Sequence, residues 1–153
     1  KPAWHDIIDH FGMEILLPDG RINREMLGGK IFKDKMERQY LEGVTHPYIK
    51  DEIQKRIDHA RSIGERVIVL DIPLLFESGW VTMVDAIWVV YVEYEIQLSR
   101  LINRNQLTLQ QAQERIAAQM SLDEKVKQAD VVITNNLDLI YTKSQVTAAW
   151  QRI

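Results

Sequence analysis

The chain of 153 residues contains no cysteine. This absence excludes disulfide bonds, zinc sites built from thiolates and catalysis by a cysteine nucleophile. No apolar run approaches the ~20 residues that a membrane-spanning helix needs. The chain opens at Lys1 with neither an initiator methionine nor a signal-peptide pattern. From the sequence we expect a soluble, cytoplasmic protein that makes no membrane contact.

Several catalytic motifs are also absent. The four histidines show no metal-ligand spacing, and no serine stands in a G-x-S-x-G elbow. The one Gly-Lys step, Gly29-Lys30, is not a phosphate-binding loop, because Arg24 and Ile31 stand where the pattern needs Gly and Ser or Thr. As written, the chain has no backbone cradle for a triphosphate.

The composition is that of a globular domain, with 46% apolar and 27% charged residues. A net charge of -3 argues against a general nucleic-acid binder, which would be basic. It still allows a local basic site for a phosphorylated small molecule.

The residue pattern in the first part of the chain, about residues 1–63, predicts helices and turns. Ile7, Ile8 and Phe11 share a helical stripe that Gly12 would end. The other elements predicted here are a turn at 18–20, short helices at 24–32 and 35–41, and a separate long helix that opens at Thr45-His46-Pro47.

From Arg66 onward the pattern changes to strands alternating with helices. Short apolar runs predict buried parallel strands at 67–70, 86–92 and 131–133. Helices are predicted at 93–104, 108–119, 122–129 and 137–152, with capping-box spacing at Thr108 and Ser121. Such alternation indicates a parallel sheet covered by helices. Because a sheet of three strands is thin, we expect a further strand and helix ahead of Lys1.

The segment after the first predicted strand is a candidate ligand site, because open α/β sheets bind ligands beyond the carboxyl ends of their strands. Asp71 has the local form of a carboxylate that orients magnesium. Leu74, Leu75 and Phe76 would line an apolar ligand wall or, equally well, pack helices onto the sheet.

Three arginines form a second candidate site. Arg100, Arg104 and Arg115 have no carboxylate three or four residues away on their helices. Guanidinium groups in this setting suit a ligand with several phosphate oxygens, although a solvated helix face would also account for them. His46, at the predicted helix start, would either approach a phosphate or cap the helix.

Taken together, ordered phrases along the whole chain resemble the dephospho-CoA kinase family. The phrases are Phe11-Gly12, Leu17-Pro18-Asp19-Gly20, Thr45-His46-Pro47, Val69 to Glu77, Arg100-Leu101 with Arg104, Arg115 to Met120, and Ala129 to Ile133 with Asn135. This resemblance implies an α/β fold of the P-loop NTPase type, similar to nucleotide kinases, with a three-layer parallel sheet. It also implies an acceptor-binding region at 1–65, a nucleotide-binding core at 66–104 and 121–153, and a lid at 105–120.

The resemblance implies a function as well: ATP-dependent phosphorylation of the ribose 3′-hydroxyl of dephospho-CoA, with Mg²⁺. Arg104 and Arg115 would be catalytic, and with Arg100 and Asn135 would bind ATP. The implied acceptor site consists of His46, Asp71, Leu74, Leu75, Phe76 and Glu77, with Asp71 also acting indirectly on the metal. In the family, the P-loop and the general base precede the point where this sequence begins, so we expect the 153 residues alone to be inactive.

Two other interpretations stay open from the sequence. One is a nucleoside or nucleotide kinase of the same fold with a different acceptor. The other is a non-catalytic relic that binds a ligand resembling CoA.

Overall fold

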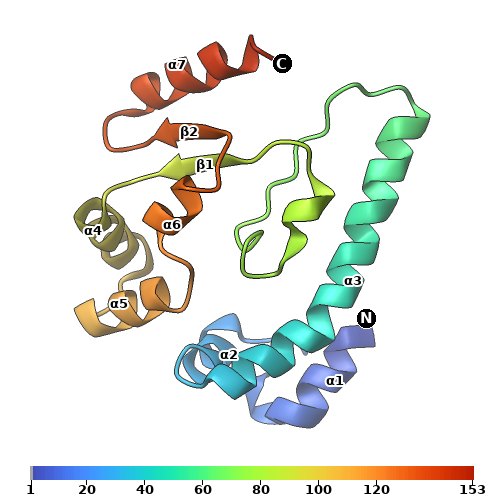
Figure 1. The fold of residues 1–153 in the computed structure, drawn as a ribbon. Coiled ribbons are helices and arrows are strands. Elements are labelled where there is room, and N and C mark those ends of the chain that lie inside the picture. The colour runs from blue at the N-terminus through green and yellow to red at the C-terminus, as the bar shows by residue number, and fades with distance from the viewer. Residues whose placement is uncertain (1) are drawn as a thin grey trace. The chain divides into compact units, whose positions relative to one another are not determined.

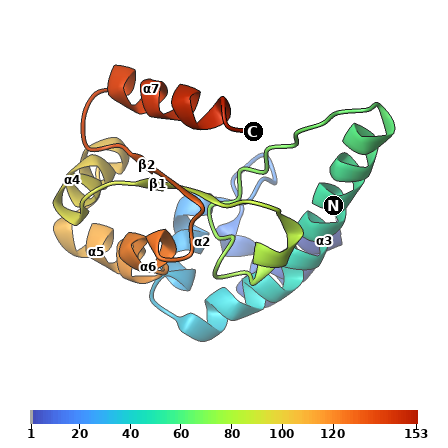
Figure 2. The same cartoon turned by 45° about the horizontal axis from the view of Figure 1, so that its top comes forward.

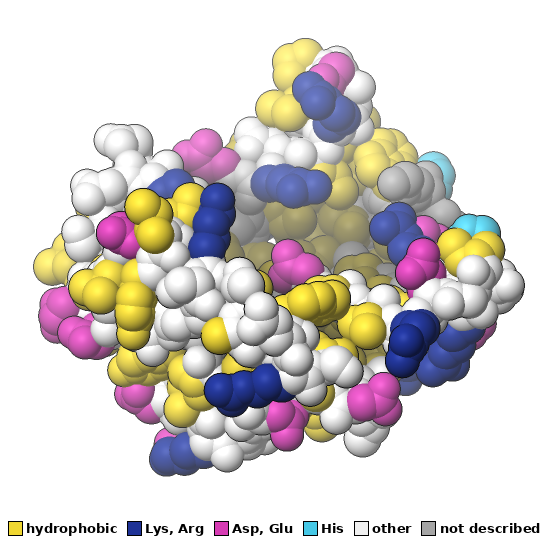
Figure 3. All heavy atoms as spheres, turned by 90° about the horizontal axis from the view of Figure 1, so that it is seen from above, with side chains coloured by type: hydrophobic (Ala, Val, Ile, Leu, Met, Phe, Trp, Pro, Cys, Tyr) yellow, Lys and Arg dark blue, Asp and Glu magenta, His cyan; other side chains and the backbone are white. Residues whose placement is uncertain are grey.

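The computed structural model describes residues 2–153, which form two compact units, one ending at Asp71 and the other covering Ile72–Ile153 (Figure 1). On the face shown in Figure 3, basic and acidic side chains are interspersed, without one large patch of either sign. No helix among the described residues combines the length and apolar character that crossing a membrane requires.

The first unit is helical, as the sequence predicts. Its elements are α1 (Pro2–Phe11), the 3-10 turn η1 (Met13–Ile15), α2 (Arg24–Ile31) and the long α3 (Lys35–Ser62). The buried core consists of Ile7, Phe11, Ile15 and Leu27. Gly12 ends α1 with a φ of 85°, a left-handed conformation that favours glycine. The predicted turn at 18–20 is confirmed by a hydrogen bond from Gly20 N–H to Leu17 O of 2.9 Å.

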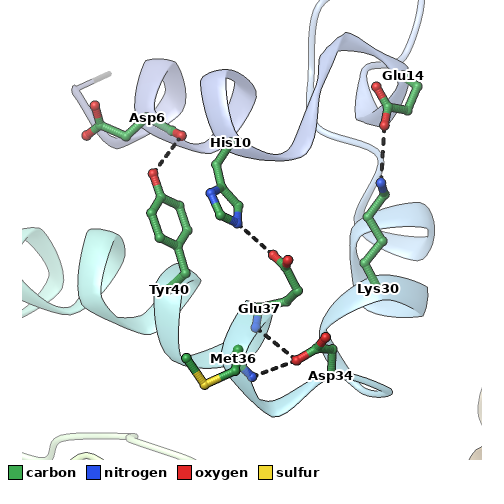
Figure 4. A network of polar contacts seen from close by, with 8 residues as sticks. All are labelled: Asp6, His10, Glu14, Lys30, Asp34, Met36, Glu37 and Tyr40. Carbon is green, nitrogen blue, oxygen red and sulfur yellow. Dashed lines mark hydrogen bonds and ion pairs between the residues drawn. The ribbon is translucent and has the colours of Figure 1, made fainter.

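A polar network lies on the outside of this unit, where α1 faces α3 (Figure 4). His10 Nε2 lies 2.7 Å from Glu37 Oε2, and the His10 ring stacks on Tyr40 with centroids 3.6 Å apart. The Tyr40 hydroxyl donates to the backbone oxygen of Asp6 at 3.2 Å. These contacts fix the two helices side by side through partly exposed groups.

The prediction of two helices around Thr45-His46-Pro47 is wrong. α3 runs unbroken from Lys35 to Ser62 with Pro47 inside it. Proline cannot donate to the carbonyl four residues earlier, so the helix loses one bond, and Figures 1 and 2 show α3 changing direction part-way along. The Thr45 hydroxyl donates to Leu41 O at 2.7 Å within the same turns. His46 therefore lies inside a helix rather than at its start.

The predicted strand at 67–70 does not form. Residues 65–72 follow α3 without regular structure, and Val67 and Val69 are 41% and 74% exposed. A strand requires a neighbour that accepts and donates its backbone hydrogen bonds, and no strand among the described residues pairs with this run. Asp71 consequently follows an irregular segment rather than a strand, and the residue is exposed.

The second unit contains the parallel sheet. Its elements are the 3-10 turn η2 (Trp80–Met83), β1 (Trp88–Tyr91), α4 (Tyr94–Asn105), α5 (Leu109–Ala117), α6 (Leu122–Val126), β2 (Val131–Thr134) and α7 (Leu139–Trp150). β1 pairs in parallel with β2, with Trp88 opposite Val131 and Tyr91 opposite Thr134. The strands predicted at 86–92 and 131–133 and the four helices predicted around them are confirmed, with shifted ends.

Helices cover both faces of this two-stranded sheet. α7 packs against β2 on one side and α6 packs against β1 on the other, while α4 and α5 pack against each other (Figures 1 and 2). Val89 and Ile133 are buried, with Leu98 of α4 and Ala112 of α5 also in the interior. The capping box at Thr108 and Gln111 is present, and the Ser121 hydroxyl accepts from Glu124 N–H, so α5 and α6 begin where the sequence predicts.

Candidate active site

The carboxyl ends of β1 and β2 lie together, because the two strands are parallel and in register. Arg100, on α4 after β1, donates from Nη1 to the backbone oxygen of Asn135, the residue after β2, at 2.7 Å. Asn135 N–H donates to Tyr91 O at 2.7 Å, and its side-chain oxygen accepts from the Thr142 hydroxyl at 3.1 Å. The structure thus brings two of the predicted ATP-binding residues into direct contact at the edge where α/β sheets bind ligands.

The sequence analysis missed a second link at this edge. Asn136 donates to Glu93 Oε1 at 2.8 Å and accepts from Glu93 N–H at 2.9 Å. This reciprocal pair joins the residues that follow β1 to those that follow β2, and it fixes the loop that carries Asn135. Its only signal in the sequence is a polar residue two positions after each strand, Glu93 after β1 and Asn136 after β2.

Arg104 and Arg115 stand on neighbouring helices that pack against each other, α4 and α5. The exposed Arg104 is in the last turn of α4, and its Nε donates to Asn105 Oδ1 at 2.9 Å. Arg115 is half-buried near the end of α5. Among residues 2–153, neither Arg100 nor Arg104 forms an ion pair with a carboxylate, so their charges are available to an anionic ligand.

A small pocket opens at the carboxyl end of β1. It holds about 60 Å³ and is lined by Tyr91, Val92, Tyr94, Gln97, Ile116, Ser121, Leu122 and Asp123. A hydrogen bond to Asp123 raises the pKa of the Tyr91 phenol above its ordinary value, with a smaller contribution from desolvation. The phenol therefore stays protonated and links β1 to the start of α6.

The predicted apolar wall, Leu74, Leu75 and Phe76, lies in a run of turns ahead of η2. All three side chains are half-buried, and backbone bonds such as Ser78 N–H to Leu74 O (2.9 Å) stabilise the turns. Glu77 follows them, and its carboxylate is engaged twice. Its Oε1 lies 2.9 Å from Lys125 Nζ and accepts from Met120 N–H at 2.9 Å.

Lys125 is the largest omission of the sequence analysis. It is only 7% exposed. It lies on the short helix α6, directly after two other charged residues, Asp123 and Glu124. Its ammonium group also donates to Pro73 O at 3.3 Å and lies 5.9 Å from the centre of the Phe76 ring. Nothing in the local sequence distinguishes it from a solvated lysine, because its partner Glu77 is remote along the chain.

The remaining predicted acceptor residues, His46 and Asp71, belong to the first unit. His46 is half-buried within α3, and Asp71 is exposed. No cluster of three or more metal-ligating side chains occurs in the described part of the chain.

Comparison with known proteins identifies the family. A family model described as dephospho-CoA kinase matches residues 1–140. The chain belongs to the dephospho-CoA kinase family. A dephospho-CoA kinase of Symbiobacterium thermophilum is 45% identical over 150 residues, which is 98% of this chain and 63% of that protein. One from Listeria innocua is 46% identical over 147 residues, which is 96% of this chain and 74% of that protein.

Solved structures agree with this assignment. The dephospho-CoA kinase of Campylobacter jejuni matches with a TM-score of 0.59 and 28% identity, covering 98% of this chain and 80% of that one. A crystal structure of a protein from Thermus thermophilus matches with a TM-score of 0.69 and 26% identity, covering 97% and 73%. The expected fold class, an α/β fold of the P-loop nucleotide-kinase type, is confirmed. The chain spans 63% of the length of the Symbiobacterium relative, slightly less than two thirds.

Proposed function

We propose that the protein to which this chain belongs transfers the γ-phosphoryl group of ATP to the ribose 3′-hydroxyl of dephospho-CoA, giving CoA and ADP. The observation that carries this proposal is the match of residues 1–140 to the dephospho-CoA kinase family. The contact between Arg100 and Asn135 at the carboxyl edge of the sheet supports it, because nucleotides bind at this edge in related folds.

In this proposal the second unit binds ATP. Arg100 and Asn135 lie on the adenine side, while Arg104 and Arg115 approach the transferring phosphates. Phosphoryl transfer depends mainly on positioning and on neutralising the negative charge that spreads over the phosphate oxygens. Residues 105–120 act as the lid that excludes water, which would otherwise compete with the acceptor hydroxyl.

The acceptor site is proposed to include His46, Asp71, Leu74, Leu75, Phe76 and Glu77. The apolar side chains would contact the uncharged part of dephospho-CoA, and the polar ones would orient its hydroxyl. Mg²⁺ is proposed to accompany ATP and to neutralise phosphate charge, with Asp71 orienting its hydration shell. No general base and no phosphate-loop lysine is assigned to these 153 residues. A cytoplasmic location, without nucleic-acid or membrane partners, stays a prediction from the sequence.

The test is an acceptor comparison with the full-length protein encoded by the gene. ADP release is measured with ATP and Mg²⁺ in the presence of dephospho-CoA, of nucleoside monophosphates, or of no acceptor. We expect rapid release only with dephospho-CoA, together with a product that co-elutes with CoA. Faster turnover with a nucleoside monophosphate would show a nucleotide kinase, and binding of dephospho-CoA without turnover would show a relic.

A further inference from the structure

Lys125 is the one buried charged side chain in the part of the chain that the structure describes. Transferring an ammonium group out of water is costly, and a buried ion pair is often no more stabilising than apolar residues of similar volume. Stability alone therefore gives little reason for a lysine at this position. The contacts of the Lys125 ammonium group with other segments of the chain indicate a second role for its charge.

The ammonium group of Lys125 holds the segment before η2 at both of its ends. It lies 3.3 Å from Pro73 O at the start of the segment and 2.9 Å from Glu77 Oε1 at the end. Between these two anchors, the Phe76 ring faces the same ammonium group at 5.9 Å. Lys125 thus fixes the path of the backbone that carries Leu74, Leu75 and Phe76.

The Glu77 carboxylate extends this connection to a third segment. The oxygen that meets Lys125 also accepts from Met120 N–H at 2.9 Å. Met120 is the last residue of the proposed lid, and Ser121 after it caps α6, the helix that carries Lys125. The wall, the end of the lid and α6 therefore meet at one carboxylate oxygen of Glu77.

We propose that Lys125 is a positioning residue that acts through Glu77 to hold the apolar wall in the shape that dephospho-CoA requires. This inference rests on the proposed function. Lys125 touches no reacting atom, and it fixes Glu77 and the wall before the acceptor binds. Preorganisation of this kind lowers the cost of ordering a site when the ligand arrives.

The test uses the full-length protein with Lys125→Met, which keeps an apolar stem of similar length and removes the charge. We expect kcat/KM for dephospho-CoA to fall on the order of tenfold to a hundredfold, chiefly through a higher KM. The KM for ATP should change by less than about twofold, because the Arg100 and Asn135 contact is untouched. A residue that only stabilised the fold would affect the two substrates alike.

Lys127→Met is the matched control, since Lys127 lies just after the same helix and pairs with Glu124 in an exposed position. We expect its kinetic constants to equal those of the wild type. If Lys125→Met does not fold, Lys125→Gln serves instead, because its amide still donates to Glu77 without a charge. The same preferential rise in KM for dephospho-CoA is then expected.

A folded Lys125 variant with an unchanged KM for dephospho-CoA would overturn the inference, and so would an equal rise for both substrates. A wild-type protein that does not phosphorylate dephospho-CoA would overturn the proposed function along with it. The two failures are distinguishable, because the first appears only in the variant and the second already in the wild type.

Discussion

The two units of the chain differ in how deeply their ion pairs are buried, because, within the described residues, only the second contains a largely buried pair. In the first unit, the core of Ile7, Phe11, Ile15 and Leu27 is apolar, and the ion pairs lie at the surface. The Lys30 and Glu14 side chains, for example, are 42% and 56% exposed although they lie 3.1 Å apart. In the second unit, Lys125 and Glu77 form a pair whose side chains are only 8% and 21% exposed.

The comparison distinguishes ion pairs that lie in solvent from an ion pair that is largely buried. An exposed pair gains little, because water already solvates both groups and the side chains lose freedom when they meet. A buried pair responds strongly to the loss of one partner, since the remaining charge is poorly solvated. Changes at the exposed pairs of the first unit should therefore have small effects, and changes at the largely buried pair of Lys125 and Glu77 should have large ones.

The largest expected effect concerns catalysis at Arg104. Arg104→Met should lower kcat on the order of a hundredfold to a thousandfold, because a charge that stabilises the transferring phosphates would be lost. The matched control is Arg56→Met, an exposed arginine on α3 that pairs with Glu52. Steady-state kinetics with ATP and dephospho-CoA should show near wild-type values for the control. Similar kcat values for both variants would contradict the proposed role of Arg104.

The next effect tests the comparison directly through stability. Lys125→Met should lower the free energy of unfolding by about 3 kcal/mol, the lower end for buried pairs, since Glu77 keeps some contact with solvent. Lys30→Met, in the exposed pair of the first unit, should leave unfolding nearly unchanged. Urea denaturation of the two variants measures the difference. Equal stabilities would mean that burial does not distinguish the two pairs.

Local sequence patterns predicted the elements that depend on short-range physics. The stripe of Ile7, Ile8 and Phe11 gave a helix that ends before Gly12, and the capping box at Thr108 gave a helix with the expected start. The runs at 86–92 and 131–133 gave strands because each has the other as its hydrogen-bonding neighbour. In each case the stop, the cap or the neighbouring strand that the element needs can itself be recognised in the sequence.

The errors occurred where a distant partner decides the outcome. The run at 67–70 has strand character, but no strand among the described residues pairs with it. Pro47 is a helix-start signal that the packing of α3 overrides, at the cost of one backbone bond. Lys125 looks like a solvated lysine until the fold places it beside Glu77. The sequence analysis placed Arg100 and Asn135 in the same ATP-binding site, but it did not predict their direct contact.

Helix caps provide a test in which the two units should behave alike. Asp34 accepts from Met36 N–H at 2.7 Å at the start of α3, and Thr108 accepts from Gln111 N–H at 3.2 Å at the start of α5. Replacing either residue with Ala should cost about 1 kcal/mol of stability, measured by thermal or urea unfolding. The kinetics should differ, however, because only Thr108 belongs to the proposed lid. A rise in the KM for ATP in the Asp34 variant alone would count against that lid.

The smallest effect is a pH dependence within the first unit, at Glu14. A hydrogen bond from its own backbone, followed by one from Lys30, holds the pKa of this carboxyl below its ordinary value of 4.5. A carboxyl whose pKa is lower in the folded state stabilises the fold above its unfolded pKa, and loses this contribution as the pH falls through its folded pKa. Glu14→Gln cannot ionise, so its stability deficit relative to the wild type should be constant at neutral pH and disappear as the pH falls below 4.5.

Urea unfolding of both proteins from about pH 7 down to about pH 3 measures this difference, and the other carboxyl groups cancel because they titrate in both. Lys30→Met should retain part of the dependence, since the backbone hydrogen bond to Glu14 remains and is the larger cause. A stability deficit of Glu14→Gln that grows toward acid pH would be the opposite of the expected pH dependence. It would show that the ionised form of Glu14 is disfavoured in the fold, so this surface charge would resemble a buried one after all.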